Sequence, residues 1–189
     1  SEAKKINAEI IHIHNFWLLI SPATHYYLYK SGYPIVQTLH NYRLTCLNAM
    51  LLKNNMPCEL CVGNSMLAGL LNKCYKKSIF HSYIIRRMVL SGRKKNIWNN
   101  SVTSYITFTN FSRNLFIKAG IPENKLVVKP NSIDITRKLS TRNRSSVILF
   151  VGRLSKQKGM DTIIEVAKNI KSKIVICGDG PYKEILDNL

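Results

Sequence analysis

The stretch from Phe150 to Met160 reads Phe-Val-Gly-Arg-Leu-Ser-Lys-Gln-Lys-Gly-Met, and it decides the fold that the sequence predicts. The apolar, β-branched residues 147–151 are typical of a buried strand, and from Met160 onward apolar residues recur at helical spacing. The turn between strand and helix combines glycine with fixed positive charge, at Gly152, Arg153, Lys156, Lys158 and Gly159. Flexible backbone and cations at the start of a helix favour an anion. We therefore predict a strand, a phosphate-binding turn and a helix.

Two common phosphate motifs do not fit this turn. The spacing from Gly152 to Gly159 differs from that of a Walker loop, and Lys183 stands where a dinucleotide fingerprint beginning at Gly178 needs its third glycine or alanine. What remains is Gly-Arg-Leu-x-x-x-Lys-Gly after one strand and Ile-Val-Ile-Cys-Gly-Asp-Gly-Pro at the end of the next. A basic surface turn in an ordinary α/β unit is the alternative interpretation.

This pair of motifs resembles the donor half of the retaining glycosyltransferases of family 4, which have the two-domain GT-B architecture. The resemblance implies an α/β fold of two Rossmann-like domains with parallel sheets, both incomplete in this chain. It also implies that Arg153 and Lys158 bind the diphosphate of a nucleotide sugar, and that Gly152, Gly178 and Gly180 belong to the same donor-binding site.

Histidines follow two predicted strands in the first half of the chain. Residues 10–13 read as a short buried strand that leads into His14 and Asn15, and residues 34–39 read as a second strand that leads into His40 and Asn41. Ligands of open α/β sheets bind beyond the carboxyl ends of strands. His12 and His14 are two residues apart and therefore share one face of an extended segment. Histidines with a structural role, or simply exposed, are the alternative.

The order of these motifs resembles the acceptor-side domain of the same family. The resemblance implies that His40 lies beside the reacting sugar, which makes it the candidate catalytic residue, with His14, Asn15 and Asn41 on the acceptor side. Many members have aspartate at the position of Asn41. An amide oxygen can still accept a hydrogen bond from an imidazole N–H, so the departure weakens the expectation for His40 without removing it.

The domain organisation follows from the same motifs. We predict a partial acceptor-side domain over residues 1–131, a polar and basic linker over residues 132–146, and the start of the nucleotide-sugar-binding domain over residues 147–189. The family's first strand with its glycine-rich loop, and its Glu-x7-Glu segment, are expected outside this chain, which therefore looks like a middle piece.

The net charge of +18, with only 10 acidic residues, indicates an anionic partner: phosphate, nucleic acid or anionic lipid. Residues 65–91 read as a helical segment with an apolar stripe and many basic residues. Such a segment suits an anionic membrane surface, and its alternative is a domain core with a solvated basic face. The spacing of aromatic residues matches no RNA-binding platform, so no nucleic-acid partner is predicted.

Five cysteines and no recognisable export signal favour free thiols over a disulfide framework. Cys58 and Cys61 form a Cys-x-x-Cys pair flanked by Cys46 and Cys74, in a loop where structural zinc is an alternative to packed or redox-sensitive thiols. GT-B enzymes generally need no metal for transfer, so the resemblance implies neither metal nor cofactor.

No apolar run reaches the roughly 20 residues that span a bilayer, and we expect a cytoplasmic protein, with peripheral attachment at the inner face of the cell membrane as a further expectation.

The resemblance implies a specific reaction. A sugar would pass from a UDP- or GDP-type nucleotide sugar to a polysaccharide or lipid-linked acceptor, with the anomeric configuration retained. Three alternatives stay open: an inactive glycosyltransferase fragment, a nucleotide-sugar epimerase of the same architecture, and a basic nucleic-acid-binding module.

Overall fold

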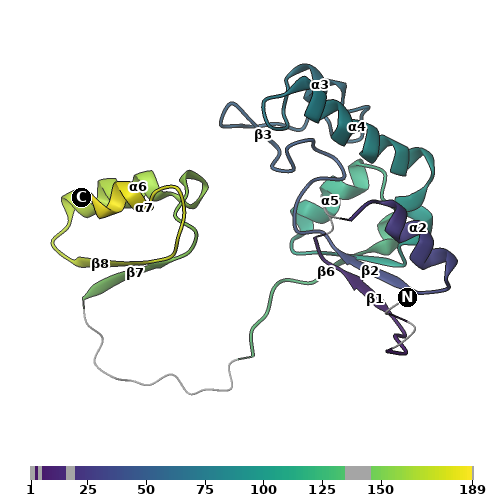
Figure 1. The fold of residues 1–189 in the computed structure, drawn as a ribbon. Coiled ribbons are helices and arrows are strands. Elements are labelled where there is room, and N and C mark those ends of the chain that lie inside the picture. Colours follow the sequence, from purple (N-terminus) through teal and green to yellow (C-terminus); the bar gives the residue numbers. More distant parts are fainter. Residues whose placement is uncertain (1–2, 4–5, 16–19, 135–145, 189) are drawn as a thin grey trace. The chain divides into compact units, whose positions relative to one another are not determined.

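The computed structural model describes residue 3 and residues 6–15, 20–134 and 146–188. The chain divides into two compact units, Ser1–Ile133 and Asp134–Leu189, each of which is described by itself (Figure 1). The division lies inside the predicted linker, residues 132–146, most of which lies outside the described residues.

A parallel sheet organises the first unit. Its strands run in the order β1 (Ile11–Ile13), β2 (Ile35–Thr38), β5 (Ser104–Thr107) and β6 (Leu126–Val128), and every neighbouring pair is parallel. Because all four strands point the same way, their carboxyl ends meet at one edge of the sheet. That edge carries the residues after Ile13, Thr38, Thr107 and Val128.

Helices connect these strands (Figure 1). α2 (Ala23–Lys30) joins β1 to β2 and α5 (Asn110–Lys118) joins β5 to β6, with the single turn η2 (Glu123–Lys125) before β6. The long connection from β2 to β5 holds the hairpin of β3 (Leu52–Lys53) and β4 (Met56–Pro57), then α3 (Leu67–Leu71), α4 (Ile79–Lys94) and the π-helical turn η1 (Ile97–Ser101).

The main core of the first unit lies between the sheet and the helices that pack on it. Ile35 and Tyr105 of adjacent strands are fully buried there with Val102, and Phe116 of α5 and Trp98 of η1 complete the cluster. Tyr105 donates a 2.7 Å hydrogen bond to the carbonyl of Trp98, which satisfies its buried hydroxyl. A second cluster holds α4 against the segment before α3 through Met66, Ile85 and Val89, with Leu47 and Cys61.

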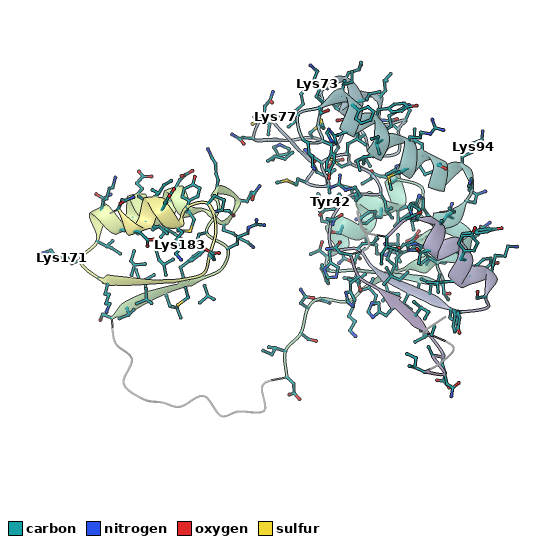
Figure 2. The ribbon with its side chains drawn as sticks, in the orientation of Figure 1. Tyr42, Lys73, Lys77, Lys94, Lys171 and Lys183 are labelled. Carbon is teal, nitrogen blue, oxygen red and sulfur yellow. The ribbon has the colours of Figure 1, made fainter. Side chains whose placement is uncertain are left out.

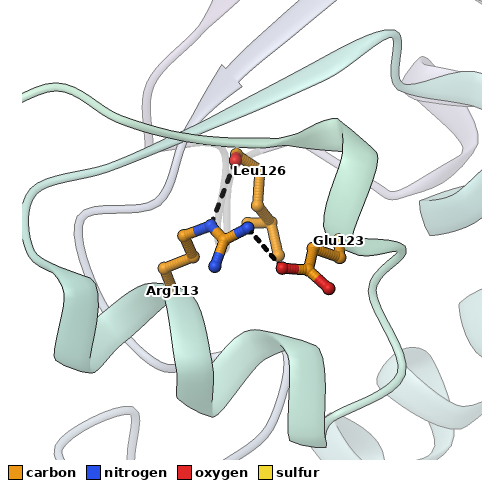
Figure 3. A network of polar contacts seen from close by, with 3 residues as sticks. All are labelled: Arg113, Glu123 and Leu126. Carbon is orange, nitrogen blue, oxygen red and sulfur yellow. Dashed lines mark hydrogen bonds and ion pairs between the residues drawn. The ribbon is translucent and has the colours of Figure 1, made fainter.

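Arg113 ties α5 to the start of β6 (Figure 3). Its Nη2 lies 2.7 Å from Oε1 of Glu123, and its Nε donates to the carbonyl of Leu126 at 3.4 Å. The contact is partly exposed, so the ion pair contributes at most about 1 kcal/mol, and its main effect is to fix the turn that leads into β6.

One sequence-based expectation about helices is wrong. Residues 65–91 do not form one helix, because the chain breaks after α3 and resumes at Ser78, with Lys73, Lys76 and Lys77 at positive φ in between. The oxygen of Ser78 accepts from the backbone N–H of His81 and starts α4 there. Thr109 caps α5 in the same way, because its side chain accepts from the N–H of Ser112.

The second unit is a strand–turn–helix–strand arrangement. β7 (Val147–Val151) pairs in parallel with β8 (Lys173–Cys177), and α6 (Met160–Asn169) connects them after the short 3-10 turn η3 (Lys156–Lys158). α7 (Lys183–Asp187) follows β8. Met160, which is fully buried, and Leu154 anchor the turn and the start of α6.

The α/β fold with Rossmann-like parallel sheets, predicted from the sequence, is confirmed in both units. Strand, turn and helix around residues 147–169 lie where the sequence places them. Of the helices that the structure describes, none is long and apolar enough to cross a membrane.

Candidate functional site

The carboxyl edge of the first sheet brings two predicted site histidines into direct contact. Nδ1 of His14, just after β1, lies 2.8 Å from Nε2 of His40, just after β2. His12 lies on the same face as His14, with ring centroids 4.2 Å apart, as the alternation of side chains along a strand predicts. His12 in turn contacts Thr38, with 2.8 Å between Nε2 and Oγ1.

The two predicted acceptor-side asparagines also meet. Nδ2 of Asn41 donates to Oδ1 of Asn15 at 3.1 Å, and Oδ1 of Asn41 accepts from the backbone N–H of Arg43. Asn41 therefore holds the turn after β2 and the segment after β1 together. The hydrogen bonds of the Asn41 amide thus go to Asn15 and Arg43, and it is His14 that contacts His40.

A pocket of about 230 Å³ opens between the carboxyl ends of the four strands. His12, His14 and His40 line one part of it, and Phe108 and Lys129 line another, together with Thr38, Ile106, Pro130, Asn131 and Ser132. The ring of Phe108 meets His40 edge-on at 5.1 Å between centroids. His12, Phe108 and Lys129 are absent from the predicted site residues, although the alternation of side chains along the first strand already placed His12 on the same face as His14.

Positive neighbours shape the electrostatics of this pocket. Partial desolvation, followed by the charges of His14, Lys129 and His40, lowers the pKa of His12 below its ordinary value of 6.5. His12, His14, His40 and Lys129 are all exposed at the mouth, so a ligand can reach them.

The predicted donor-binding glycines lie together in the second unit. Gly152 follows β7, and Gly178 and Gly180 follow β8, where the two turns pack backbone against backbone. A Cβ on Gly178 would collide with the carbonyl of Gly152, and one on Gly180 would lie 2.9 Å from the backbone N of Leu154. The close approach of the two turns therefore requires glycine at positions 178 and 180.

Backbone hydrogen bonds lock the two turns. The N–H of Gly152 donates to the carbonyl of Cys177 at 3.0 Å, and that of Leu154 donates to the carbonyl of Asp179 at 2.9 Å. The backbone N–H groups of Gly152 and Leu154 therefore already have acceptors within the protein. α6 begins after Gly159, whose φ is 77°. The first backbone N–H groups of a helix lack partners within it, and together with the helix dipole they favour an anion at this end.

Arg153 and Lys158 are exposed, and within the described part of the chain neither side chain has a hydrogen bond or ion pair. Nearby, Lys156 lies 3.9 Å from Asp161, and Asp161 accepts a 2.7 Å hydrogen bond from the hydroxyl of Tyr182. Asp161, at the start of α6, thus has Lys156 and Tyr182 as partners, while Arg153 and Lys158 are available to bind an anion.

Four cysteines, Cys46, Cys58, Cys61 and Cys74, line one small cavity beside the β3–β4 hairpin. Burial raises the pKa of Cys61 and of Cys74, which favours the neutral thiol over the thiolate that metals and electrophiles require. Among the described residues, all cysteines are free, and no group of three or more His, Cys, Asp or Glu side chains is arranged to hold a metal ion.

Comparison with known proteins shows what the second unit is similar to. The structure defines an α/β chain with a glycine-rich, cationic turn, and residues 124–189 match the family described as "Glycosyl transferases group 1". One similar curated protein is the 2-deoxystreptamine N-acetyl-D-glucosaminyltransferase of Niallia circulans, which is 40% identical over 45 residues. That alignment covers 21% of this chain and 12% of the relative, so the chain spans a small part of the relative's length.

The family match covers the unit that carries Arg153, Lys158 and the three packed glycines. His14, Asn15, His40 and Asn41 lie in the other unit, before the matched segment. The structure brings each set together within its own unit. The donor-binding and catalytic roles of these residues stay predictions.

Proposed function

We propose that the protein is a glycosyltransferase that moves a sugar from a nucleotide-diphosphate sugar to a hydroxyl of a polysaccharide or lipid-linked acceptor, with retention of configuration. One observation carries the proposal: within the segment similar to group 1 glycosyl transferases, Arg153 and Lys158 are exposed cations beside the start of α6. A diphosphate is an anion that such a turn can bind without first breaking an ion pair.

The proposed chemistry uses these cations where negative charge develops. When the bond between the sugar and the diphosphate breaks, the leaving group gains charge, and fixed cations stabilise it more in the transition state than in the ground state. Loss of one such group costs on the order of 100-fold in rate. His40, held by His14, is the proposed polar residue beside the reacting sugar. The chain supplies the sites for donor and acceptor, and no metal or cofactor is proposed.

A membrane surface is the proposed location of the acceptor. Much of the apolar stripe predicted over residues 65–91 is exposed rather than buried: Phe80 and Leu71 are each 66% exposed, and Ile79 is 53% exposed. Lys73 and Lys77 project from the segment between α3 and α4 (Figure 2), and Lys76 and Arg87 are exposed beside them. Apolar side chains ringed by cations suit the headgroup region of an anionic bilayer, where each basic residue contributes about 1 kcal/mol. Attachment at the inner face of the cell membrane stays a prediction.

The experiment that tests the proposed function starts with the choice of a donor sugar. N-acetylglucosamine is the sugar named for the Niallia circulans protein, so nucleotide-activated N-acetylglucosamine is the first donor to examine, followed by other UDP- and GDP-sugars. Formation of a glycosylated product in the presence of an isoprenyl-phosphate-linked acceptor supports the proposal. Conversion of the nucleotide sugar to an isomer without any acceptor would instead indicate an epimerase, and absence of donor binding would indicate an inactive fragment.

A further inference from the structure

The pocket at the carboxyl edge of the first sheet gathers several groups that can bind an anion, beside the apolar side chains of Ile106, Phe108 and Pro130. Three imidazoles, from His12, His14 and His40, face the same 230 Å³ space as the ammonium group of Lys129. Arg43 lines a smaller, adjoining pocket that shares His14 and His40, and its guanidinium donates to the carbonyl of Leu47 and lies 4.9 Å from the centre of the Tyr75 ring. These groups come from the ends of β1, β2 and β6, so the sheet itself gathers them.

Acidic groups do not balance this charge. Of the described residues that line the two pockets, none is aspartate or glutamate. Glu123 pairs with Arg113 and Glu59 lies 3.7 Å from Lys118, and neither cation belongs to either pocket. The pocket therefore has cationic groups and no described carboxylate of its own, and an anionic ligand would balance that charge.

The hydrogen-bonding groups of the pocket match a phosphate. A phosphate oxygen accepts hydrogen bonds, and the ammonium of Lys129, the amide of Asn131 and the hydroxyls of Thr38 and Ser132 can all donate. The His14–His40 contact uses one nitrogen of each ring; the ring that accepts in it already carries a hydrogen on its other nitrogen, and the ring that donates gains one there when it is protonated. An anion would favour that protonation, just as the positive neighbours now disfavour it at His12.

We propose that this pocket binds a phosphate group carried by the acceptor, distinct from the donor diphosphate assigned to Arg153 and Lys158. That the phosphate belongs to the acceptor rests on the proposed function, whereas the phosphate site itself rests on the geometry of the first unit alone. The phosphate could belong to a lipid-linked acceptor or to a free sugar phosphate, and both place the same chemistry in the pocket.

Protonation should accompany binding. A bound phosphate brings negative charge next to His12, His14 and His40, with Lys129 as the other charged group that lines the pocket and Arg43 in the adjoining smaller one. The affinity for phosphate should therefore rise as the pH falls from 8 to 6, by about tenfold per pH unit for each proton taken up. A neutral sugar bound by hydrogen bonds alone would show no such rise.

The experiment is calorimetric titration of the 189-residue chain with a short-chain isoprenyl phosphate and with glucose 1-phosphate, in buffers of different ionisation enthalpy. The buffer dependence of the heat counts the protons taken up. Lys129→Gln and His40→Gln each remove a charge-assisted hydrogen bond and should weaken binding by about tenfold or more. Lys168→Gln and His81→Gln, on exposed positions of α6 and α4, should leave it unchanged.

Each outcome decides a separate claim. Tighter binding of the isoprenyl phosphate identifies a lipid-linked source, and equal or tighter binding of glucose 1-phosphate identifies a free sugar phosphate; both support the pocket. Phosphate binding that survives Lys129→Gln but is lost in the Arg153→Ala, Lys158→Ala double variant would overturn the inference, because the anion would then occupy the second unit. Phosphate binding without any sugar transfer would contradict the proposed function and leave the phosphate site standing.

Discussion

His14 and His40 are 26 residues apart in the sequence, yet Nδ1 of the first lies 2.8 Å from Nε2 of the second. One of these two nitrogens must carry a hydrogen and donate it, so each ring fixes the tautomer and orientation of the other. The contact exists because β1 and β2 are parallel neighbours, which places the residues that follow them at the same edge of the sheet.

Removing His40 should therefore impair sugar transfer. We expect His40→Ala to lower the rate by on the order of 100-fold, because a positioned side chain that exchanges protons or hydrogen bonds in the transition state contributes about that much. The readout is release of nucleoside diphosphate from the donor that binds best. His81→Ala, which changes an exposed histidine on α4, is the matched control, and equal rates in the two variants would exclude His40 from the reaction.

His25 should make the first unit less stable in mild acid. It is fully buried, its Nε2 lies 3.0 Å from Oε1 of Gln37, and burial lowers its pKa below 6.5. Below about pH 6.5 the unfolded chain therefore binds a proton that the folded chain resists, and the free energy of unfolding should fall as the pH falls through that window. His12, whose pKa is also lowered, adds a smaller effect of the same sign.

Urea unfolding followed by tryptophan fluorescence measures this effect, since both tryptophans of the chain, Trp17 and Trp98, belong to the first unit. In His25→Asn the residue no longer titrates, so the free energy of unfolding should depend less on pH between 7.5 and 5, even though the variant is less stable overall. An unchanged pH dependence would show that another group is responsible.

The glycines of the second unit should differ sharply in their tolerance of alanine. Gly178→Ala drives a methyl group into the backbone of Gly152, and Gly180→Ala drives one into Leu154, so each should destabilise the unit by about 1–3 kcal/mol. Gly152→Ala should be tolerated, because its added methyl would meet only the ring of Phe150, at 3.5 Å. Hydrogen exchange of the β7 and β8 amides measures the difference, and equal protection in all three variants would contradict it.

The exposed basic segment after α3 should bind anionic vesicles. We expect the triple change of Lys73, Lys76 and Lys77 to glutamine to weaken binding to phosphatidylglycerol vesicles by about 100-fold, at about 1 kcal/mol per cation. The control changes Lys168, Lys171 and Lys173 of the second unit to glutamine, which removes the same charge elsewhere. Equal losses in the two triple variants, measured by vesicle flotation, would mean that net charge alone attracts the protein.

The sequence predicts the strand ends well, and with them much of the site. Apolar runs that stop at Gly152, His14 and His40 mark the carboxyl ends of β7, β1 and β2, so the pattern of residues alone assigns the side chains beyond them to the carboxyl edge of a sheet. Periodicity fails over residues 65–91, because a turn with Lys73, Lys76 and Lys77 at positive φ separates α3 from α4.

The site predicted from the sequence lacks Lys129 for a different reason. A lysine at a strand end has no distinctive pattern, and only the order of strands in the sheet shows that β6 lies within reach of the histidines after β1 and β2. The packing of Gly178 against Gly152 was equally invisible, since it depends on how closely two turns approach and not on the spacing between them.

The central claim is tested most directly by the affinity of nucleotide sugars for the Arg153→Ala, Lys158→Ala double variant, measured by calorimetry beside the Lys168→Ala, Lys171→Ala double variant. Each lost cation should cost about tenfold or more in affinity, so the first variant should bind the preferred nucleotide sugar at least about 100-fold more weakly than the second. Equal affinities in the two variants would contradict the claim that the turn after β7 binds the donor diphosphate.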